Sequence, residues 1–331
     1  MPYINGLGIY TPEKIIDNAY LEKLVDTSDE WITSRTGIKR RRMAAEDQIT
    51  SDLAYHASLA ALEDSGRRLD EITHVYVSTS TPDALCPATA YVLIHKLGIK
   101  GVMAFDSNAA CSGFVNALQL ANYTAQADPN AVILLVAAEV MTRKLDWTDR
   151  STCVLFGDGA GAVIVSQNLP ENPRGFTAKI CDLLVDSDGK FSELISIHAG
   201  GSRQSYKVGD PVNREYFIAM EGREVFKQAV RSMVQASETL LERNGLTVSD
   251  VALVIPHQAN DRIIQAVGER LEVPQDKLFA NVSEYGNTSS ATVPIALYDA
   301  NKERLLPKGS KVLLTTFGGG FIWTAALLEI V

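Results

Sequence analysis

The chain alternates short apolar runs with segments whose apolar residues recur every three or four positions, patterns typical of buried strands and amphipathic helices. Residues 73–79 and 102–105 predict strands, and residues 89–97 and 112–125 predict the helices that follow them. The continuous apolar run at 131–138 is typical of a strand that is buried on both faces of a sheet. This order of elements predicts an α/β fold.

The later half of the chain repeats this plan. Residues 251–255 predict a strand, and the apolar spacing across 263–271 predicts an amphipathic helix after it. A further strand is predicted to begin at Leu278. Residues 291–300 predict a helix with its proline in the first turns, where proline is tolerated, and residues 311–316 predict another buried strand.

The two patterns share one strand–loop–helix layout, over 97–118 and over 271–297, which indicates a duplicated fold. We therefore divide the chain into two halves, 1–170 and 171–331. A pseudo-twofold axis between the halves would bring two equivalent helix starts together, one at Cys111 and one at Asn287. Ligand sites in α/β sheets favour such strand ends. No low-complexity linker separates the halves, which predicts one continuous core.

Composition and charge narrow the possible functions. With 46% hydrophobic and 21% charged residues, the chain has the balance of a soluble globular protein, and its longest apolar run is too short to cross a membrane. The N-terminus lacks a signal-peptide pattern, so we expect a cytoplasmic protein. A net charge of −9 argues against nucleic-acid binding. The basic run at 39–42 fits a solvated loop and a docking site for an acidic partner equally well.

The cysteine pattern gives no indication of a metal or a disulfide. The chain has four cysteines, none in a C-x-x-C pair and none with a histidine at metal-ligand spacing. The glycine-rich stretch 157–162 satisfies G-x-G-x-x-A, but it leads into a predicted strand, which argues against a dinucleotide site. We therefore expect no metal and no cofactor.

Cys111 is the candidate nucleophile among these cysteines. It lies in Asn-Ala-Ala-Cys-Ser-Gly-Phe, where small residues let a substrate and the backbone approach closely. At the start of a helix, the positive end of the dipole and unpaired N–H groups stabilise a thiolate, which is the form that attacks a thioester. Taken alone, the segment also fits a packed cysteine at a strand-to-helix turn.

A histidine and an asparagine stand at comparable places in the later half. His257 ends an apolar strand and opens a helix within Pro-His-Gln-Ala-Asn, and Asn287 lies in Tyr-Gly-Asn-Thr-Ser before a helix. Each also has a plain structural interpretation. A histidine at a strand end is often structural, Asn287 fits a turn, and Ser289 or Ser290 fits a helix cap.

The motifs are most informative in combination. Four of them occur in order, at 108–114, 256–260, 286–294 and 317–321, and supporting stretches lie at 28–38 and 156–162. Over essentially the whole chain, this combination resembles the beta-ketoacyl-ACP synthase III family of fatty-acid synthesis.

The resemblance implies a five-layered αβαβα fold of the thiolase type and a homodimer. A short acyl-CoA, a substrate rather than a cofactor, would acylate Cys111. Malonyl-acyl carrier protein would then lose carbon dioxide, and its enolate would attack the thioester to give a 3-ketoacyl product. His257 and Asn287 would donate hydrogen bonds to the malonyl thioester oxygen as charge builds there. The backbone N–H groups of Cys111 and Gly319 would form a second oxyanion hole.

Other matching positions imply where the substrates dock. Trp31, Arg35 and Arg150 would bind the adenine and phosphates of CoA, since an indole face and a guanidinium plane can sandwich an adenine. The plain alternative for Trp31 is ordinary helix packing. Arg262 matches a position that receives the acidic carrier protein, although acidic neighbours weaken that patch.

Cys86 departs from the family pattern. At this position the family often has a bulky aromatic residue, contributed by the partner subunit, that closes the acyl pocket. The smaller cysteine predicts room for a longer or branched acyl chain. Alternatively, Leu85 or a neighbour refills the space.

Several rival functions share the family's features. A secondary-metabolism relative would join the acyl group to another acceptor, such as an oxygen or nitrogen nucleophile, whereas the Cys-His-Asn set favours decarboxylative condensation. A thiolase would carry a second cysteine in the C-terminal glycine-rich loop. An HMG-CoA-synthase-like enzyme would carry a glutamate supported by a motif. A non-catalytic subunit that only shapes an acyl channel usually loses the nucleophile, which this chain keeps.

Overall fold

The structure is a computed structural model, and it describes residues 1–204 and 206–331. Its main element is a nine-stranded mixed sheet. In spatial order, the strands are β11 (Leu253–Pro256), β12 (Lys311–Gly318), β13 (Ile322–Ile330), β8 (Thr177–Ser187), β1 (Tyr3–Tyr10), β7 (Asp158–Ser166), β6 (Val132–Val140), β4 (His74–Ser78) and β5 (Met103–Ser107).

The longer helices pack against this sheet. They are α3 (Thr50–Ser65), α4 (Thr89–Leu97), α5 (Gly113–Ala127), α7 (Gly222–Arg243), α8 (Asp261–Arg270) and α10 (Thr292–Lys302). Shorter elements lie beside this framework: α1 (Asn18–Leu21), α2 (Asp29–Thr36), α6 (Arg150–Cys153), α9 (Val282–Tyr285), and the strand pairs β2 (Lys14–Asp17) with β3 (Arg40–Met43) and β9 (Ile195–Ser196) with β10 (Ala219–Met220).

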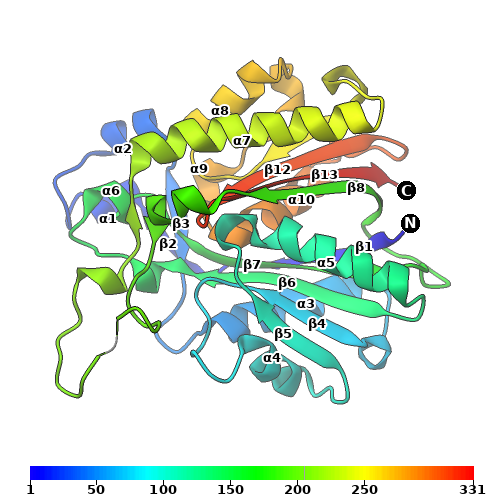
Figure 1. Ribbon diagram of the computed structural model, residues 1–331, viewed down its shortest axis with the longest axis horizontal. Helices are drawn as coiled ribbons and strands as arrows, with labels where there is room; N and C mark the ends of the chain where they lie inside the picture. The colour runs from blue at the N-terminus through cyan, green and yellow to red at the C-terminus, as the bar shows by residue number, and fades with distance from the viewer. Residues whose placement is uncertain (205) are drawn as a thin grey trace.

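Sheet and helices form five layers, as Figure 1 shows. α5 and α10 lie in the middle, between the part of the sheet that contains β12, β13 and β8 and the part that contains β7, β6 and β4. α7 covers the first part from outside, and α3 and α4 cover the second. Along β6, Ile133 and Leu135 face the middle helices, whereas Leu134 and Val136 face α3 and α4. The predicted αβαβα arrangement is therefore confirmed.

β8 joins the two parts of the sheet. It pairs antiparallel with β1 on one side and with β13 on the other. The chain passes from β7 to β8 through residues 167–176, the segment that contains the proposed division at residue 170. The apolar cluster around the middle helices contains residues from both sides of that division, such as Leu118 and Leu297, so the core is continuous across it.

Most elements that the hydrophobic pattern predicts are present, with one exception. The helix predicted at 89–97 is α4 with the same bounds, and the run at 131–138 coincides with β6, whose residues are all buried. The strand predicted to begin at Leu278 is wrong, because that residue makes only an isolated bridge with Val254. Asn281 ends the extended segment, since Gln258 accepts from its N–H at 2.8 Å and Asp299 from its side chain at 2.9 Å.

The basic run at 39–42 is not a solvated loop. Most of it forms β3, in which Arg41 is fully buried and donates to Asn18 Oδ1 at 2.6 Å. Burial lowers the pKa of this guanidinium to about 10. Arg40 is paired with Glu284 at 3.0 Å. These contacts tie β3 to its neighbours and correct the loop interpretation, whereas Lys39 and Arg40 remain exposed.

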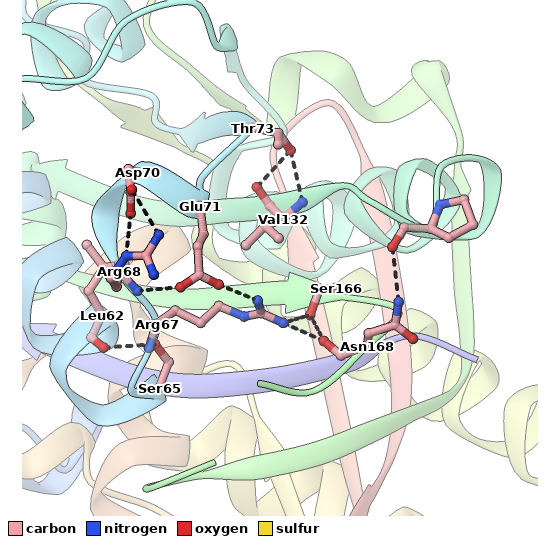
Figure 2. Close-up of polar contacts among 11 residues, drawn as sticks. Leu62, Ser65, Arg67, Arg68, Asp70, Glu71, Thr73, Val132, Ser166 and Asn168 are labelled. Carbon is pink, nitrogen blue, oxygen red and sulfur yellow. Dashed lines mark hydrogen bonds and ion pairs between the residues drawn. The ribbon is translucent and has the colours of Figure 1, made fainter. Parts of the chain in front are cut away.

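Arg67 forms a clamp at the C-terminal end of β7, beside Ser166 (Figure 2). Only 8% of the Arg67 side chain is exposed, and its guanidinium is 3.0 Å from Glu71. It also donates to Ser166 Oγ at 3.0 Å and to the carbonyl oxygen of Asn168. Arg67 therefore fastens the end of α3 to the end of β7.

Replacing Arg67 with methionine is expected to lower the free energy of unfolding by about 1.5 kcal/mol, because the change removes hydrogen bonds of a buried charge. Urea unfolding measures this loss. Arg68→Met is the matched control, since 74% of the Arg68 side chain is exposed and its ion pair with Asp70 contributes little. Equal losses in the two variants would contradict the clamp.

Candidate active site

Cys111 lies in a single 3-10 turn, η2 (Ala110–Ser112), between the end of β5 and the start of α5. The hydrogen bonds of this turn use the N–H groups of Ser112 and Gly113, and the N–H of Cys111 takes no part in them. Gly113 packs closely against Ser78, since a Cβ at position 113 would lie 1.9 Å from Ser78 Oγ. Cys111 is buried, with 8% of the residue exposed. The small residues of the motif therefore serve close packing around the thiol.

Asn287 stands in front of the turn η8 (Ser289–Ala291), which opens α10. Its N–H donates to the Leu155 carbonyl at 2.9 Å, and its carbonyl accepts from Gly157 N–H at 3.1 Å. Its Oδ1 accepts from the N–H of Ser289 at 2.8 Å, which assigns the orientation of the side-chain amide. Asn287 therefore presents its Nδ2 donors to the surroundings.

His257 follows directly after β11 and is fully buried. Its Nδ1 lies 2.6 Å from the Thr292 hydroxyl. The Thr292 hydroxyl also lies 3.0 Å from the Ser289 carbonyl oxygen, so its single proton is directed either to that carbonyl or to Nδ1, and Nε2 carries the ring proton only in the second case. In the part of the chain that the structure describes, Nε2 has no hydrogen-bond partner. Burial lowers the pKa of His257 to about 3, so the ring is neutral near neutral pH.

One cavity of about 1080 Å³ brings the predicted residues together. Cys111, His257, Asn287 and Gly319 all line it. The glycine-rich loop passes close to the cysteine, since a Cβ on Gly318 would lie 3.0 Å from Cys111 N. The cavity therefore places a thiol, a neutral imidazole, a side-chain amide and glycine backbone around a common space.

A polar residue outside the motifs, Glu139, lies near Cys111, and Ser289 of the 286–294 motif stands between them. Ser289 Oγ lies 3.7 Å from Cys111 Sγ and donates to Glu139 Oε1 at 3.1 Å. Ser290 donates to the same oxygen at 2.8 Å, so the helix-cap role expected of these serines is wrong. Glu139 lies in β6 and is fully buried. An acidic residue directly after the apolar run 131–138 is the sequence signal that could have identified it.

The resting nucleophile is a thiol rather than the thiolate expected at a helix start. Burial raises the pKa of Cys111 to about 12, the hydrogen bond with Ser289 lowers it, and the carboxylate of Glu139 raises it. The cost of burying a charge therefore exceeds the stabilisation that a helix start provides. Cys111 must lose its proton as it attacks.

The predicted CoA-binding residues lie on two short helices. Arg35, on α2, lines the cavity. Trp31 lies one turn earlier on α2, and the guanidinium of Arg150 is stacked over its ring, with Cζ 4.6 Å from the ring centroid. Arg150 also donates to the Asp26 carbonyl at 2.6 Å. Because the guanidinium covers the indole face, an adenine can enter between them only after Arg150 moves.

Arg262 and Cys86 are both exposed. Arg262 is on α8 at the edge of the cavity, and its guanidinium lies 5.7 Å from the ring centroid of Phe226. Leu85, which is 83% exposed, also lines the cavity. Cys86 is not among the described residues that line the cavity of its own chain.

Among residues 1–204 and 206–331, no three His, Cys, Asp or Glu side chains are grouped so that they could hold a metal ion. In the same described ranges, no helix is both long enough and apolar enough to span a bilayer.

The five-layered fold, with a buried cysteine, a neutral histidine and an asparagine around one cavity, is that of a thiolase-fold condensing enzyme. The family model for 3-oxoacyl-[acyl-carrier-protein (ACP)] synthase III matches residues 105–189, and the model of its C-terminal part matches residues 241–330. The beta-ketoacyl-[acyl-carrier-protein] synthase III of Oleidesulfovibrio alaskensis is 55% identical over 327 residues, which cover 99% of this chain and 98% of that protein.

Solved structures agree with the sequence comparison. The 3-oxoacyl-[acyl-carrier-protein] synthase III of Aquifex aeolicus has a TM-score of 0.89 at 42% identity, over 99% of this chain and 100% of that one. The priming beta-ketosynthase of the R1128 polyketide biosynthetic pathway has a TM-score of 0.89 at 34% identity, over 99% of this chain and 96% of that one. The chain belongs to the beta-ketoacyl-[acyl-carrier-protein] synthase III family of condensing acyltransferases.

Proposed function

We propose that this enzyme catalyses the acyl-CoA-primed condensation that starts fatty-acid synthesis. Cys111 takes the acyl group from acyl-CoA, and the acyl-enzyme then reacts with malonyl-acyl carrier protein to give carbon dioxide and 3-ketoacyl-acyl carrier protein. The observation that carries the proposal is the common cavity of the Cys111 thiol, the unpartnered Nε2 of His257 and the amide of Asn287.

His257 and Asn287 act in the decarboxylation step. Loss of carbon dioxide leaves an enolate, whose negative charge gathers on the malonyl thioester oxygen. In this step the Thr292 hydroxyl donates to Nδ1 of His257, which leaves the ring proton on Nε2. Nε2–H of His257 and Nδ2–H of Asn287 then stabilise that oxygen as donors already in position. Thr292 holds the ring of His257 through Nδ1, and Ser289 holds the amide of Asn287 through Oδ1.

A second oxyanion hole serves the acyl group on Cys111. The N–H of Cys111 is free of the turn's own hydrogen bonds, and Gly319 lines the same cavity without a side chain. The two N–H groups stabilise the oxyanion of the tetrahedral intermediate that forms when Cys111 attacks acyl-CoA and again when the enolate attacks the acyl-enzyme.

Cationic side chains at the cavity suit anionic substrates. Arg35 and Arg262 line the cavity. Trp31 lies one turn before Arg35 on α2, and Arg150 of α6 is stacked over its ring. In this proposal, Trp31, Arg35 and Arg150 bind the adenine and phosphates of CoA after Arg150 moves off the indole. Arg262 receives the acidic carrier protein.

The proposal includes a cytoplasmic homodimer. β5 is an edge strand of the sheet, and apolar side chains are exposed on it and on the flanking helices, with Met103 at 59%, Tyr91 at 52% and Tyr123 at 62%. An open edge surrounded by apolar side chains suits coverage by a second copy. Cys86 of one protomer then closes the acyl pocket of the other and leaves room for a longer or branched chain.

Priming of a secondary-metabolite pathway is the second candidate function. It is favoured by the likeness to the R1128 priming beta-ketosynthase at 34% identity. The two candidates share the chemistry at Cys111 and differ in the acyl group and in the carrier protein that they accept.

Intact mass spectrometry after incubation with a panel of acyl-CoAs tests the acylation step. The wild type is expected to gain the mass of one acyl group, and Cys111→Ala is expected to gain none, because only Cys111 faces the cavity. Cys181→Ala, at a half-buried site outside the cavity, is the matched control and retains the adduct.

The same experiment tests the acyl pocket. Preference for longer or branched acyl groups supports the role of Cys86. An adduct that survives in Cys111→Ala, or no adduct from any acyl-CoA in the wild type, would contradict the proposed function.

A further inference from the structure

Glu139 is a buried carboxylate without a cation. Its residue is fully buried in β6, and no ion pair involves it among the residues that the structure describes. Its Oε2 accepts from Thr79 Oγ1 at 3.3 Å, Ser80 N–H at 3.0 Å and Thr81 Oγ1 at 2.8 Å. Its Oε1 accepts from Ser289 Oγ at 3.1 Å and Ser290 Oγ at 2.8 Å. These donors stabilise the negative charge of the Glu139 carboxylate. Glu139 has no role in the substrate-binding steps described above.

A continuous set of hydrogen bonds connects this carboxylate to the nucleophile. The Cys111 thiol is placed to donate to Ser289 Oγ, over 3.7 Å, and Ser289 Oγ donates to Glu139 Oε1, over 3.1 Å. The donors therefore point in one direction, from the sulfur to the carboxylate. Ser290 contacts the same carboxylate oxygen and also lies 3.3 Å from the Ser78 carbonyl.

Other ionisable groups on the elements around Glu139 are engaged elsewhere. On β7, Asp158 accepts from Thr142 and from Ala44. On α3, His56 is stacked on Tyr10, and Asp52 is paired with Lys96. On β4, His74 is hydrogen-bonded to its neighbour Thr73 at the opposite end of the strand. Cys111 and Glu139 thus form a local pair, and His257 is bonded to Thr292 rather than to either of them.

We propose that Ser289 relays the thiol proton of Cys111 to Glu139, and that Glu139 holds this proton for as long as the cysteine carries the acyl group. The proposal rests on the proposed function, since it assigns the proton of the acylation step. Ser289 touches the reacting sulfur and is a catalytic residue. Glu139 acts only through Ser289.

The proton balance of the reaction closes with this assignment. As Sγ bonds to the thioester carbon, its proton passes to Ser289 Oγ, and the hydroxyl proton of Ser289 passes to Glu139. The carbon–sulfur bond to CoA then breaks, and the CoA thiolate takes a proton from solvent. In the second half, the enolate carbon attacks the acyl group, the bond to Sγ breaks, and the proton returns from Glu139 through Ser289. The free enzyme is restored.

Burial supports this role of the carboxylate in two ways. It raises the pKa of Glu139, which makes the group a stronger base than an exposed glutamate. It also raises the pKa of Cys111 to about 12, so that attack without a nearby proton acceptor would be slow.

Single-turnover acylation by acyl-CoA, quenched with acid and measured by intact mass, tests the relay. Ser289→Ala is expected to slow acylation about a hundredfold, with the half-saturating acyl-CoA concentration unchanged. Its rate is also expected to rise about tenfold per pH unit through the neutral and alkaline range, because hydroxide must replace the relay. The wild-type rate stays level over that range. Ser290→Ala removes a hydrogen bond to the same carboxylate oxygen, and it keeps the level pH profile with a much smaller loss.

Infrared difference spectra of the acyl-enzyme minus the free enzyme provide a second measurement. A protonated carboxylic acid band is expected on acylation and is lost in Glu139→Gln. The proposal is overturned if Ser289→Ala keeps the level pH profile, if the two serine variants behave alike, or if no such band forms. These results all require an acylated wild-type enzyme, so a wild type that takes no acyl group instead counts against the proposed function.

Discussion

Replacing Asn287 with aspartate is expected to slow condensation about a thousandfold, while acylation of Cys111 stays within about threefold of the wild type. Aspartate retains an oxygen that can accept the N–H of Ser289, which Asn287 holds at 2.8 Å, so the local backbone is preserved. The opposite side-chain atom changes from a donor to a carboxylate oxygen. That oxygen repels the enolate instead of stabilising it.

The two steps are measured separately. Acyl transfer is followed by intact mass without malonyl-acyl carrier protein, and condensation is followed by the 3-ketoacyl product. Asn130→Asp makes the same chemical change in an exposed turn and is expected to leave both steps at wild-type rates. If acylation and condensation fall together in Asn287→Asp, the residue serves the structure of the cavity rather than decarboxylation.

The stability of the enzyme is expected to fall in mild acid because of His257. Its pKa is lowered by burial from 6.5 to about 3, so the unfolded chain binds a proton between these values that the folded chain does not. Stability therefore decreases as the pH falls through this window. From about pH 7 to about pH 5, the contribution of this one residue is about 2 kcal/mol.

Urea unfolding of the wild type and His257→Gln at both pH values measures this contribution. The variant is expected to lose about 2 kcal/mol less than the wild type on acidification. His95→Gln, which removes an exposed histidine from α4, is expected to follow the wild type. Asp158, whose pKa burial raises to about 6, acts in the opposite direction, but it is common to all three proteins. Parallel curves for the wild type and His257→Gln would refute the assignment.

Hydrophobic periodicity was sufficient to predict the main helices and strands, because the burial of apolar side chains determines where these elements form. The helix at 89–97 and the buried run at 131–138 are each set by local apolar spacing, and both are present. The extended segment at Leu278 has strand character in the sequence, yet it makes a single bridge, because long-range contacts of Asn281 turn the chain away. Local patterns do not contain such contacts.

The motif residues of the site could be named from the sequence, but their electrostatics could not. Helix position alone predicts a thiolate at Cys111, whereas burial and the Glu139 carboxylate keep it a thiol. From the sequence alone, Ser289 fits a helix cap. In the fold, β6 lies beside η8, so Ser289 donates to Glu139 instead. The sequence likewise predicts an exposed position for Arg41, but packing of β3 against the strand and helices around it buries the side chain.

A six-residue segment, 287–292, supplies Asn287 and contacts Cys111, His257 and Glu139. Asn287 presents the amide, Ser289 touches Cys111, and Thr292 orients His257. The geometry of acyl transfer and of decarboxylation is thus set by one short piece of backbone. A compound that displaces this segment would disable both half-reactions at once. Substitutions in this segment that alter one half-reaction during evolution must also keep the contacts that the other half-reaction needs. For inhibitor design and for enzyme engineering, residues 287–292 are therefore a single unit.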